Sequence, residues 1–350
     1  MILRLNNAFP ADGVERAIAD LPTAHRLLSE CRPDVLQFLA RRRARLIAHF
    51  GHQAVSRIER VEGALKVSLA RFGMRHGSWG DDFHHYHNEN HAMEILDGRL
   101  GRLMESAGLA ALPLDAWLAL SLFATCHDLR QREAVDFSHP IGNNEAASIC
   151  ETQRILALCG FDTQRDRGLY VALEMMIAGS TFDPRPTPPP NEFNTAEVVT
   201  TAGALAPALD SLLDRELPDW RNDPDTVSAV DLTQVASDLD TANVGEAFPW
   251  LAESATRLCQ EREMRSGRSL DAVDSGQPCV GFLSDGQERY FFELHKFCSD
   301  IGRAAFAATK EQNAERLRRV SASVRERFQR QPAASGQQVV ETFSALALAV

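Results

Sequence analysis

The sequence lacks the features that mark several classes of protein. No apolar run approaches the roughly 20 residues that span a bilayer, and the longest, residues 116–126, is typical of a buried helix. The first residues contain neither the apolar stretch nor the small-residue cleavage site of a secretory signal. The 7 cysteines include no Cys-x-x-Cys pair, and one is necessarily unpaired. These absences favour a reduced, cytoplasmic protein with no membrane partner.

Basic residues are in deficit. The 350-residue chain has 48 acidic and 37 basic residues, for a formal charge of −11. This charge argues against nonspecific binding to nucleic acid. The run Arg41-Arg42-Arg43-Ala44-Arg45 is most simply the solvated side of an amphipathic helix. Hydrophobic residues at 44% and charged residues at 24% are typical of a folded globular chain. The length fits one large domain or two ordinary ones, and a homo-oligomer is compatible with it.

Alternating apolar and polar residues are also scarce, and residues 65–69 are a weak candidate strand. Elsewhere the apolar residues recur at helical spacing. The expected helices are 35–49, 91–105, 114–129, 144–158, 169–178, 195–213, 233–239, 245–263 and 290–309. The sequence therefore predicts an all-α fold, a helical bundle with irregular loops.

Two segments interrupt the helices. Residues 183–194 are rich in proline, and residues 265–287 are rich in Gly, Ser and Asp; each is expected to be a surface loop or a flap beside a site. We expect residues 1–75 to form a helical segment that packs on or regulates a main domain over 76–310. Residues 311–350 are expected to add a helix and a loose tail.

Histidines are concentrated in one region. Of the 11 histidines, six lie between positions 84 and 139: His84, His85, His87, His91, His127 and His139. On a helix, His87 and His91 would face the same side, because they are four residues apart. The pair His127–Asp128 ends the apolar helix, where a buried charge needs compensation. A divalent cation would provide it, since both side chains are natural metal ligands.

A further carboxylate completes the candidate site. Asp238 is the best candidate, with Asp231 and Asp240 as alternatives. The predicted metal ligands are His91, His127, Asp128 and Asp238. Two histidines and two carboxylates suit zinc, iron or manganese and leave coordination positions open for water and substrate.

The sequence motifs in these segments resemble those of a known family. Residues 86–92 read Tyr-His-Asn-Glu-Asn-His-Ala, and residues 237–240 read Ser-Asp-Leu-Asp. Together with the His–Asp pair and a later His139-Pro140, they resemble the HD superfamily of metal-dependent phosphohydrolases. The local motifs are most similar to those of the cyclic nucleotide phosphodiesterases. The resemblance covers roughly residues 80–245, and it implies an HD-type helical domain there.

The resemblance also implies roles. The four predicted ligands would hold a tight zinc, iron or manganese ion, and Asp128 would bridge to a second ion, magnesium or manganese. A hydroxide between the ions would attack phosphorus, and His87 would protonate the leaving oxygen. Asn88 would fix the turn or orient His87, and His139 would face the phosphate or support a ligand.

Arg130 and a glutamate are further candidates for a role at the substrate. Arg130 could steer phosphate, although a solvated loop is an equal alternative. In some bacterial HD hydrolases a Glu shortly after the His–Asp pair does acid–base work, and Glu133 or Glu145 would correspond to it. The expected function is thus hydrolysis of a phosphodiester, most simply a cyclic nucleotide. The alternatives are a nucleotidase acting on nucleoside monophosphates, a non-catalytic nucleotide-binding module, and an oxygen-activating di-iron protein.

Overall fold

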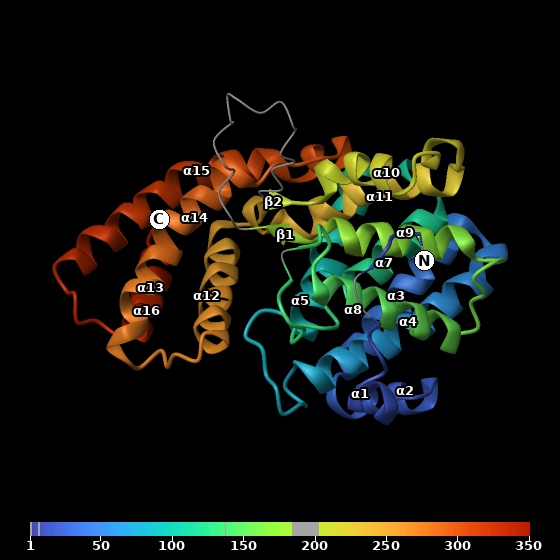
Figure 1. Cartoon of the computed structure of the whole chain (residues 1–350), viewed down its shortest axis with the longest axis horizontal. Coiled ribbons are helices and arrows are strands. Elements are labelled where there is room, and N and C mark those ends of the chain that lie inside the picture. The colour runs from blue at the N-terminus through green and yellow to red at the C-terminus, as the bar shows by residue number, and fades with distance from the viewer. Residues whose placement is uncertain (1, 6–7, 137, 184–202) are drawn as a thin grey trace. The chain divides into compact units, whose positions relative to one another are not determined.

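The computed structural model describes residues 2–5, 8–136, 138–183 and 203–350. It is built from helices, and within the described residues its one sheet consists of two short antiparallel strands, β1 (Phe182–Asp183) and β2 (Gly203–Ala204) (Figure 1). The all-α prediction is confirmed. Most of the proline-rich segment and the first part of the helix expected at 195–213 lie outside the described residues.

The chain divides into two compact units. Unit 1 comprises residues 1–83 and 87–240, and unit 2 comprises residues 84–86 and 241–350. This differs from the expected boundaries at 75 and 310. Residues 1–75 belong to the first unit because their helices share its core; for example, Arg71 donates hydrogen bonds to the carbonyl of Ile18 and pairs with Glu151 at 3.4 Å.

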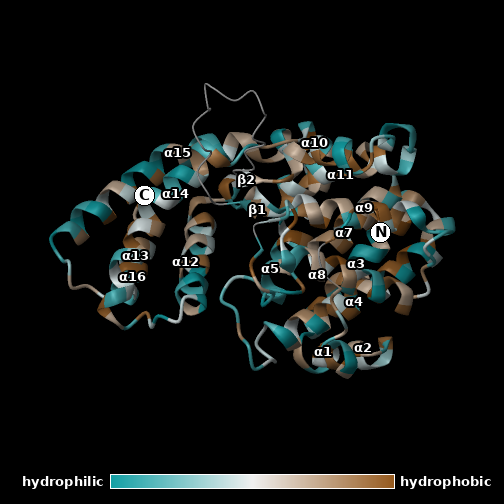
Figure 2. Ribbon diagram, viewed as in Figure 1, coloured by the Kyte–Doolittle hydropathy of each residue, from teal (hydrophilic) through white to brown (hydrophobic). Residues whose placement is uncertain are grey.

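Unit 1 is a bundle organised around one apolar helix. Its helices are α1 (Gly13–Ala17), α2 (Leu21–Cys31), α3 (Pro33–Phe50), α4 (Val55–Arg75), α5 (Glu89–Met93), α6 (Leu100–Ala107), α7 (Leu114–Cys126), α8 (Asn143–Leu158), α9 (Arg167–Gly179), α10 (Leu209–Glu216) and α11 (Pro224–Thr241). A π-helical turn, Glu94–Arg99, joins α5 to α6. Every residue of α7 from Ala116 onward is buried, and α4, α5 and α9 pack against it (Figure 2).

Buried ion pairs fix the loop that follows α7. Arg75, at the end of α4, pairs with the fully buried carboxylate of Glu151 at 2.9 Å and donates to the carbonyl of Leu129 at 2.7 Å. A buried charge is tolerated only where it is paired and hydrogen-bonded, as here. Through Leu129, this network holds the backbone just after the His–Asp pair.

Unit 2 has its own core. Its helices are α12 (Phe248–Arg265), α13 (Gly276–Gly281), α14 (Gln287–Arg289), α15 (Asp300–Gln329) and α16 (Gly336–Leu348). Helix α16 begins with a capping box between Ser335 and Gln338 and buries Val339 and Phe343 in this core. The prediction of a loose C-terminal tail was wrong, because the last residues carry an apolar helical face that needs burial.

Two other local predictions were also wrong. Residues 65–69 lie within α4, since their short alternation is part of a helix buried on nearly all sides. Residues 265–287 include α13 and a π-helical turn, Phe282–Gly286, and are not one continuous loop. Among the described residues, no helix combines the length and apolarity needed to cross a membrane.

Candidate metal centre

The C-terminal end of α7 presents His127 and Asp128. The His127 ring stacks on Phe123, with 4.7 Å between centroids, and its Nδ1 donates to the carbonyl of Phe123 at 3.1 Å. A carbonyl can only accept, so the proton of the neutral ring is on Nδ1 and the lone pair is on Nε2. Such a bond from the distal nitrogen to a carbonyl is typical of metal-binding histidines.

Two carboxylates face this nitrogen. Asp128 Oδ2 lies 3.0 Å from His127 Nε2, and Asp240 Oδ1 lies 3.3 Å from the same atom. Asp128 is the second residue after α7, whereas Asp240 is the penultimate residue of α11. Both acidic groups therefore lie at helix C-termini, where the helix dipole favours a positive charge.

His91 reaches the same point from α5. Asn88 caps this helix, and its side-chain oxygen accepts from the backbone N–H of Asn90 at 2.9 Å and of His91 at 3.4 Å. His91 Nε2 lies 3.7 Å from both Asp128 Oδ2 and Asp240 Oδ1. The structure thus brings His91, His127 and Asp128 together as predicted, and it gives Asn88 the turn-fixing role.

The fourth predicted ligand needs correction. Asp240, and not Asp238, shares the cluster with His91 and His127, whose ligand atoms all lie within 4.8 Å of one another. Residues two apart on an α-helix point about 200° away from each other, so Asp238 and Asp240 cannot both face the histidines. Asp238 is also buried, but it is not in this group of potential ligands.

The cluster fits a divalent cation. Within the described residues, His127 Nε2 is buried and has no hydrogen-bond partner, although two carboxylate oxygens lie close to it. A lone pair facing two carboxylates is repulsive unless a positive charge lies between them. Two imidazoles and two carboxylates are a common donor set for zinc, iron or manganese. Burial favours the neutral ring, yet Asp128 and Asp240 raise the pKa of His127 well above its ordinary value.

His87 lies at the edge of this group. Its Nε2 is 4.0 Å from Asp128 Oδ2, and its ring centroid is 6.1 Å from that of His91. The His87 side chain is 20% exposed, whereas those of His91 and His127 are at most 2% exposed. His87 precedes the Asn88 cap rather than lying on α5, and its ring is partly exposed to solvent.

A supporting network was missed in the sequence. Gln131 Nε2 donates to Asp128 Oδ1 at 2.8 Å, and Asn144 Nδ2 donates to Gln131 Oε1 at 3.3 Å. On the opposite side, Arg99 donates to the carbonyls of Leu239 and Asp240. Gln131 follows Asp128 by only three residues, but nothing in its spacing marks it as a partner until the fold of the loop is known.

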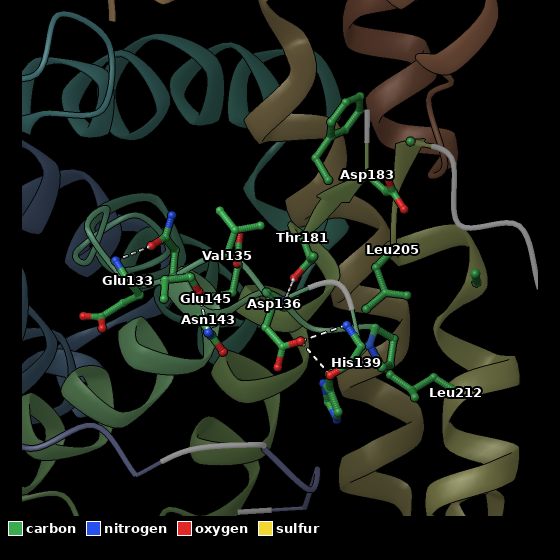
Figure 3. A pocket seen from close by; sticks show the side chains of 18 of the residues that line it. Glu133, Val135, Asp136, His139, Asn143, Glu145, Thr181, Asp183, Leu205 and Leu212 are labelled. Carbon is green, nitrogen blue, oxygen red and sulfur yellow. Dashed lines mark hydrogen bonds between the residues drawn. The ribbon is translucent and has the colours of Figure 1, made fainter. Parts of the chain in front are cut away.

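A pocket of about 430 Å³ adjoins this network (Figure 3). It is lined by Asn144 and Glu145 at the start of α8, by His139 in the loop before α8, and by Asp136 and Asp183. Burial raises the pKa of Glu145 to about 7, and the nearby charge of Asp128 acts in the same direction. Glu145 therefore lines the pocket within reach of the charge on Asp128, and it can hold or release a proton near neutral pH.

The remaining predicted residues are held by local contacts. His139 Nδ1 accepts from the backbone N–H of Ile141 at 3.1 Å, so this ring shapes the pocket wall. Arg130 pairs with Glu133 at 2.5 Å and with Glu15 at 3.5 Å. Arg130 is thus paired with two carboxylates of the protein, and its contact with phosphate stays a prediction.

Comparison with known proteins adds no family name. No family model matches the chain, and no curated protein matches it at a significant level.

Proposed function

We propose that this chain is a metal-dependent phosphohydrolase that cleaves a phosphodiester, with a cyclic nucleotide as the favoured substrate. The observation that carries the proposal is the convergence of His91, His127, Asp128 and Asp240 around the lone pair of His127 Nε2. A divalent ion held there would lower the pKa of a coordinated water and polarise a phosphoryl oxygen.

The residues around the site would then have different roles in the reaction. Phe123 and Gln131 orient His127 and Asp128 through the hydrogen bonds at 3.1 and 2.8 Å. His87, partly exposed beside Asp128, would donate a proton to the leaving oxygen. A second ion, magnesium or manganese, would share Asp128 as a ligand, because hard cations prefer carboxylate oxygen.

The pocket would take the organic part of the substrate. Its volume of about 430 Å³ is within the range of small-molecule sites. Its acidic lining, which includes Asp136, Glu145 and Asp183, favours groups that donate hydrogen bonds, such as sugar hydroxyls or a base amine. In this arrangement the metal ions would bind the phosphate.

A second candidate, hydrolysis of a phosphomonoester, is favoured by Glu145. This carboxyl lies beside the ligand cluster with a pKa raised to about 7 by burial, which suits acid–base work on a monoester as well. A non-catalytic module that only binds nucleotide would use the same pocket.

The test begins with metal content and a pair of generic substrates. Protein loaded with manganese is expected to contain bound metal and to hydrolyse bis(4-nitrophenyl) phosphate faster than 4-nitrophenyl phosphate. A screen of cyclic nucleotides and nucleoside monophosphates with product analysis then identifies the class. The reverse preference would favour the monoesterase, and binding without product would favour the module. Full activity in a His127→Ala, Asp128→Ala double variant would refute both enzymatic proposals.

A further inference from the structure

A second polar cleft lies in unit 1, away from the residues assigned above. It has a volume of about 300 Å³ and is formed by α3, the π-helical turn Glu94–Arg99 and α6. Four arginines line it: Arg41, Arg42, Arg45 and Arg102. The two acidic residues in the lining, Asp97 and Glu105, leave a net positive lining in a chain whose formal charge is −11.

Three of these arginines have no acidic partner. Among the described residues, no carboxylate lies within ion-pair distance of Arg41, Arg42 or Arg45, whereas the neighbouring Arg43 pairs with Glu62 at 3.4 Å. The guanidinium of Arg42 donates to Ser121 Oγ, which itself donates to the carbonyl of Trp117 at 2.5 Å. Arg42 is therefore oriented by a neutral hydroxyl while its charge stays uncompensated.

The local energetics favour an anion. Burial lowers the pKa of Arg42 to about 10, and the charge of Arg45 acts in the same direction. Arg42 nevertheless stays protonated at neutral pH, so its positive charge lies in an environment that solvates it poorly. Apolar walls formed by Phe38, Leu46 and Met104 lower the local dielectric and strengthen attraction to a negative ligand.

The floor of the cleft is open. A Cβ added at Gly98 or Gly101 would meet no atom within 4 Å. Both glycines line the cleft, so the space above them is free for a ligand. Guanidinium groups bind phosphate oxygens with matched, charge-assisted hydrogen bonds.

We propose that this cleft is a ligand site that binds the phosphate groups of a small polyphosphate compound through Arg41, Arg42 and Arg45. The site is independent of the proposed hydrolase function, because it shares no residue with the metal centre or its pocket. The solvated-face interpretation of the arginine run holds for Arg41 and Arg45, which are exposed, but Arg42 is turned partly inward.

Binding of inorganic tripolyphosphate tests the proposal. The titration uses the whole chain after treatment with EDTA, because the metal-free centre is then acidic and repels the probe. Wild-type protein is expected to bind one tripolyphosphate per chain, and an Arg41→Glu, Arg45→Glu double variant is expected to bind at least tenfold more weakly. Both side chains are exposed, so this variant is expected to keep the wild-type helix content and melting temperature.

Two further variants distinguish specific binding in the cleft from nonspecific electrostatic attraction to the protein. Gly101→Met fills the cleft without a charge change and is expected to weaken binding at least tenfold. Arg316→Glu, Arg319→Glu changes two exposed arginines on α15 and is expected to leave the affinity within twofold. No binding by the wild type, an equal loss in the α15 variant, or full affinity in Gly101→Met would each overturn the proposal.

A lipid headgroup carries the same phosphate chemistry, so vesicles of phosphatidylglycerol form the last arm. Weak vesicle binding beside tight tripolyphosphate binding is expected for a concave site of this size. Vesicle binding that depends on Arg41 and Arg45, with no affinity for tripolyphosphate, would overturn the assignment to a soluble ligand.

Discussion

Two buried histidines, one in each unit, have opposite surroundings. His127 in unit 1 faces the carboxylates of Asp128 and Asp240, which raise its pKa well above the ordinary value. His295 in unit 2 is also buried, but its Nδ1 accepts from Lys310 Nζ at 3.0 Å. Burial, with the charge of Lys310 acting in the same direction, lowers the pKa of His295 to about 3.

The difference shows what marks a candidate cation site. The lysine satisfies the lone pair of His295 Nδ1, and its ammonium also donates to the His295 carbonyl at 3.0 Å and lies near the rings of Phe291 and Phe297. This is a structural contact that holds the chain just after the π-helical turn Tyr290–Leu294. At His127, Nε2 faces negative charge. The raised pKa means that a proton balances this charge in the metal-free ring, and a metal ion would balance it in the proton's place.

The largest expected effect concerns the choice of carboxylate at the metal centre. Asp240→Ala is expected to remove tightly bound metal and to lower activity by about 10³-fold or more, because one of the two anionic ligands is lost. Asp238→Asn is the matched control on the same helix and is expected to retain the metal. Metal analysis and kcat/KM for both variants check this. Retained metal in Asp240→Ala, with loss in Asp238→Asn, would restore the ligand set expected from the sequence.

A smaller effect is expected at His87. His87→Ala is expected to lower kcat by about 10²-fold while metal content stays at the wild-type level, since proton donation to the leaving group contributes a factor of this order. A substrate with an activated leaving group, such as 4-nitrophenolate, should lose less. Loss of metal from His87→Ala would instead make His87 a ligand.

Loss of the Gln131 hydrogen bond to Asp128 is expected to have a smaller effect than loss of His87. Gln131→Ala is expected to weaken metal affinity by about tenfold, because the hydrogen bond that orients Asp128 is lost while the ligand itself remains. Competition with a chelator of known affinity measures this change. Gln131→Glu offers an acidic control that cannot donate the bond, and an affinity equal to that of the wild type in both variants would show that the bond does not matter.

The smallest effect concerns the other histidine of the comparison. The folded-state pKa of His295, about 3, lies below the unfolded value of about 6.5. The unfolded chain therefore binds the proton first, and stability is lost as pH falls below 6.5. At pH 5.5 this protonation lowers the free energy of unfolding by about 1.4 kcal/mol. Urea denaturation of wild type and His295→Gln at pH 7.5 and 5.5 checks this, and the variant should show the smaller loss. Equal losses would contradict the lowered pKa.

Parts of the fold and site were predictable because their signals are local. The spacing of apolar residues predicted α3, α7, α8 and α9 within one to three residues of their observed ends. The C-terminal helix had a local signal as well: Ser335 and Gln338 form the Ser-x-x-Gln pattern of a capping box, followed by an apolar face. That prediction failed because this signal was outweighed by the small and polar residues at 331–338, QPAASGQQ.

The short motif at 65–69 failed for the opposite reason. Five alternating residues fit a strand, but they are part of 21 consecutive helical residues in α4, and this helix is buried on several sides. A helix surrounded by other helices does not show a single apolar stripe, so its period is hard to recognise over a short window.

The sequence by itself determined the helical class and the placement of His127 and Asp128 at the end of an apolar helix. These depend on residues near one another in the chain. Only the tertiary structure decided that Asp240 rather than Asp238 faces the histidines, that Gln131 orients Asp128, and that Arg42 turns into a cleft. The physical reason is that the sequence of a helix fixes the angles between its own side chains around the helix axis. It does not fix how the whole helix is rotated relative to the other helices. The packing of α3, α5, α7 and α11 selects which of those side chains meet.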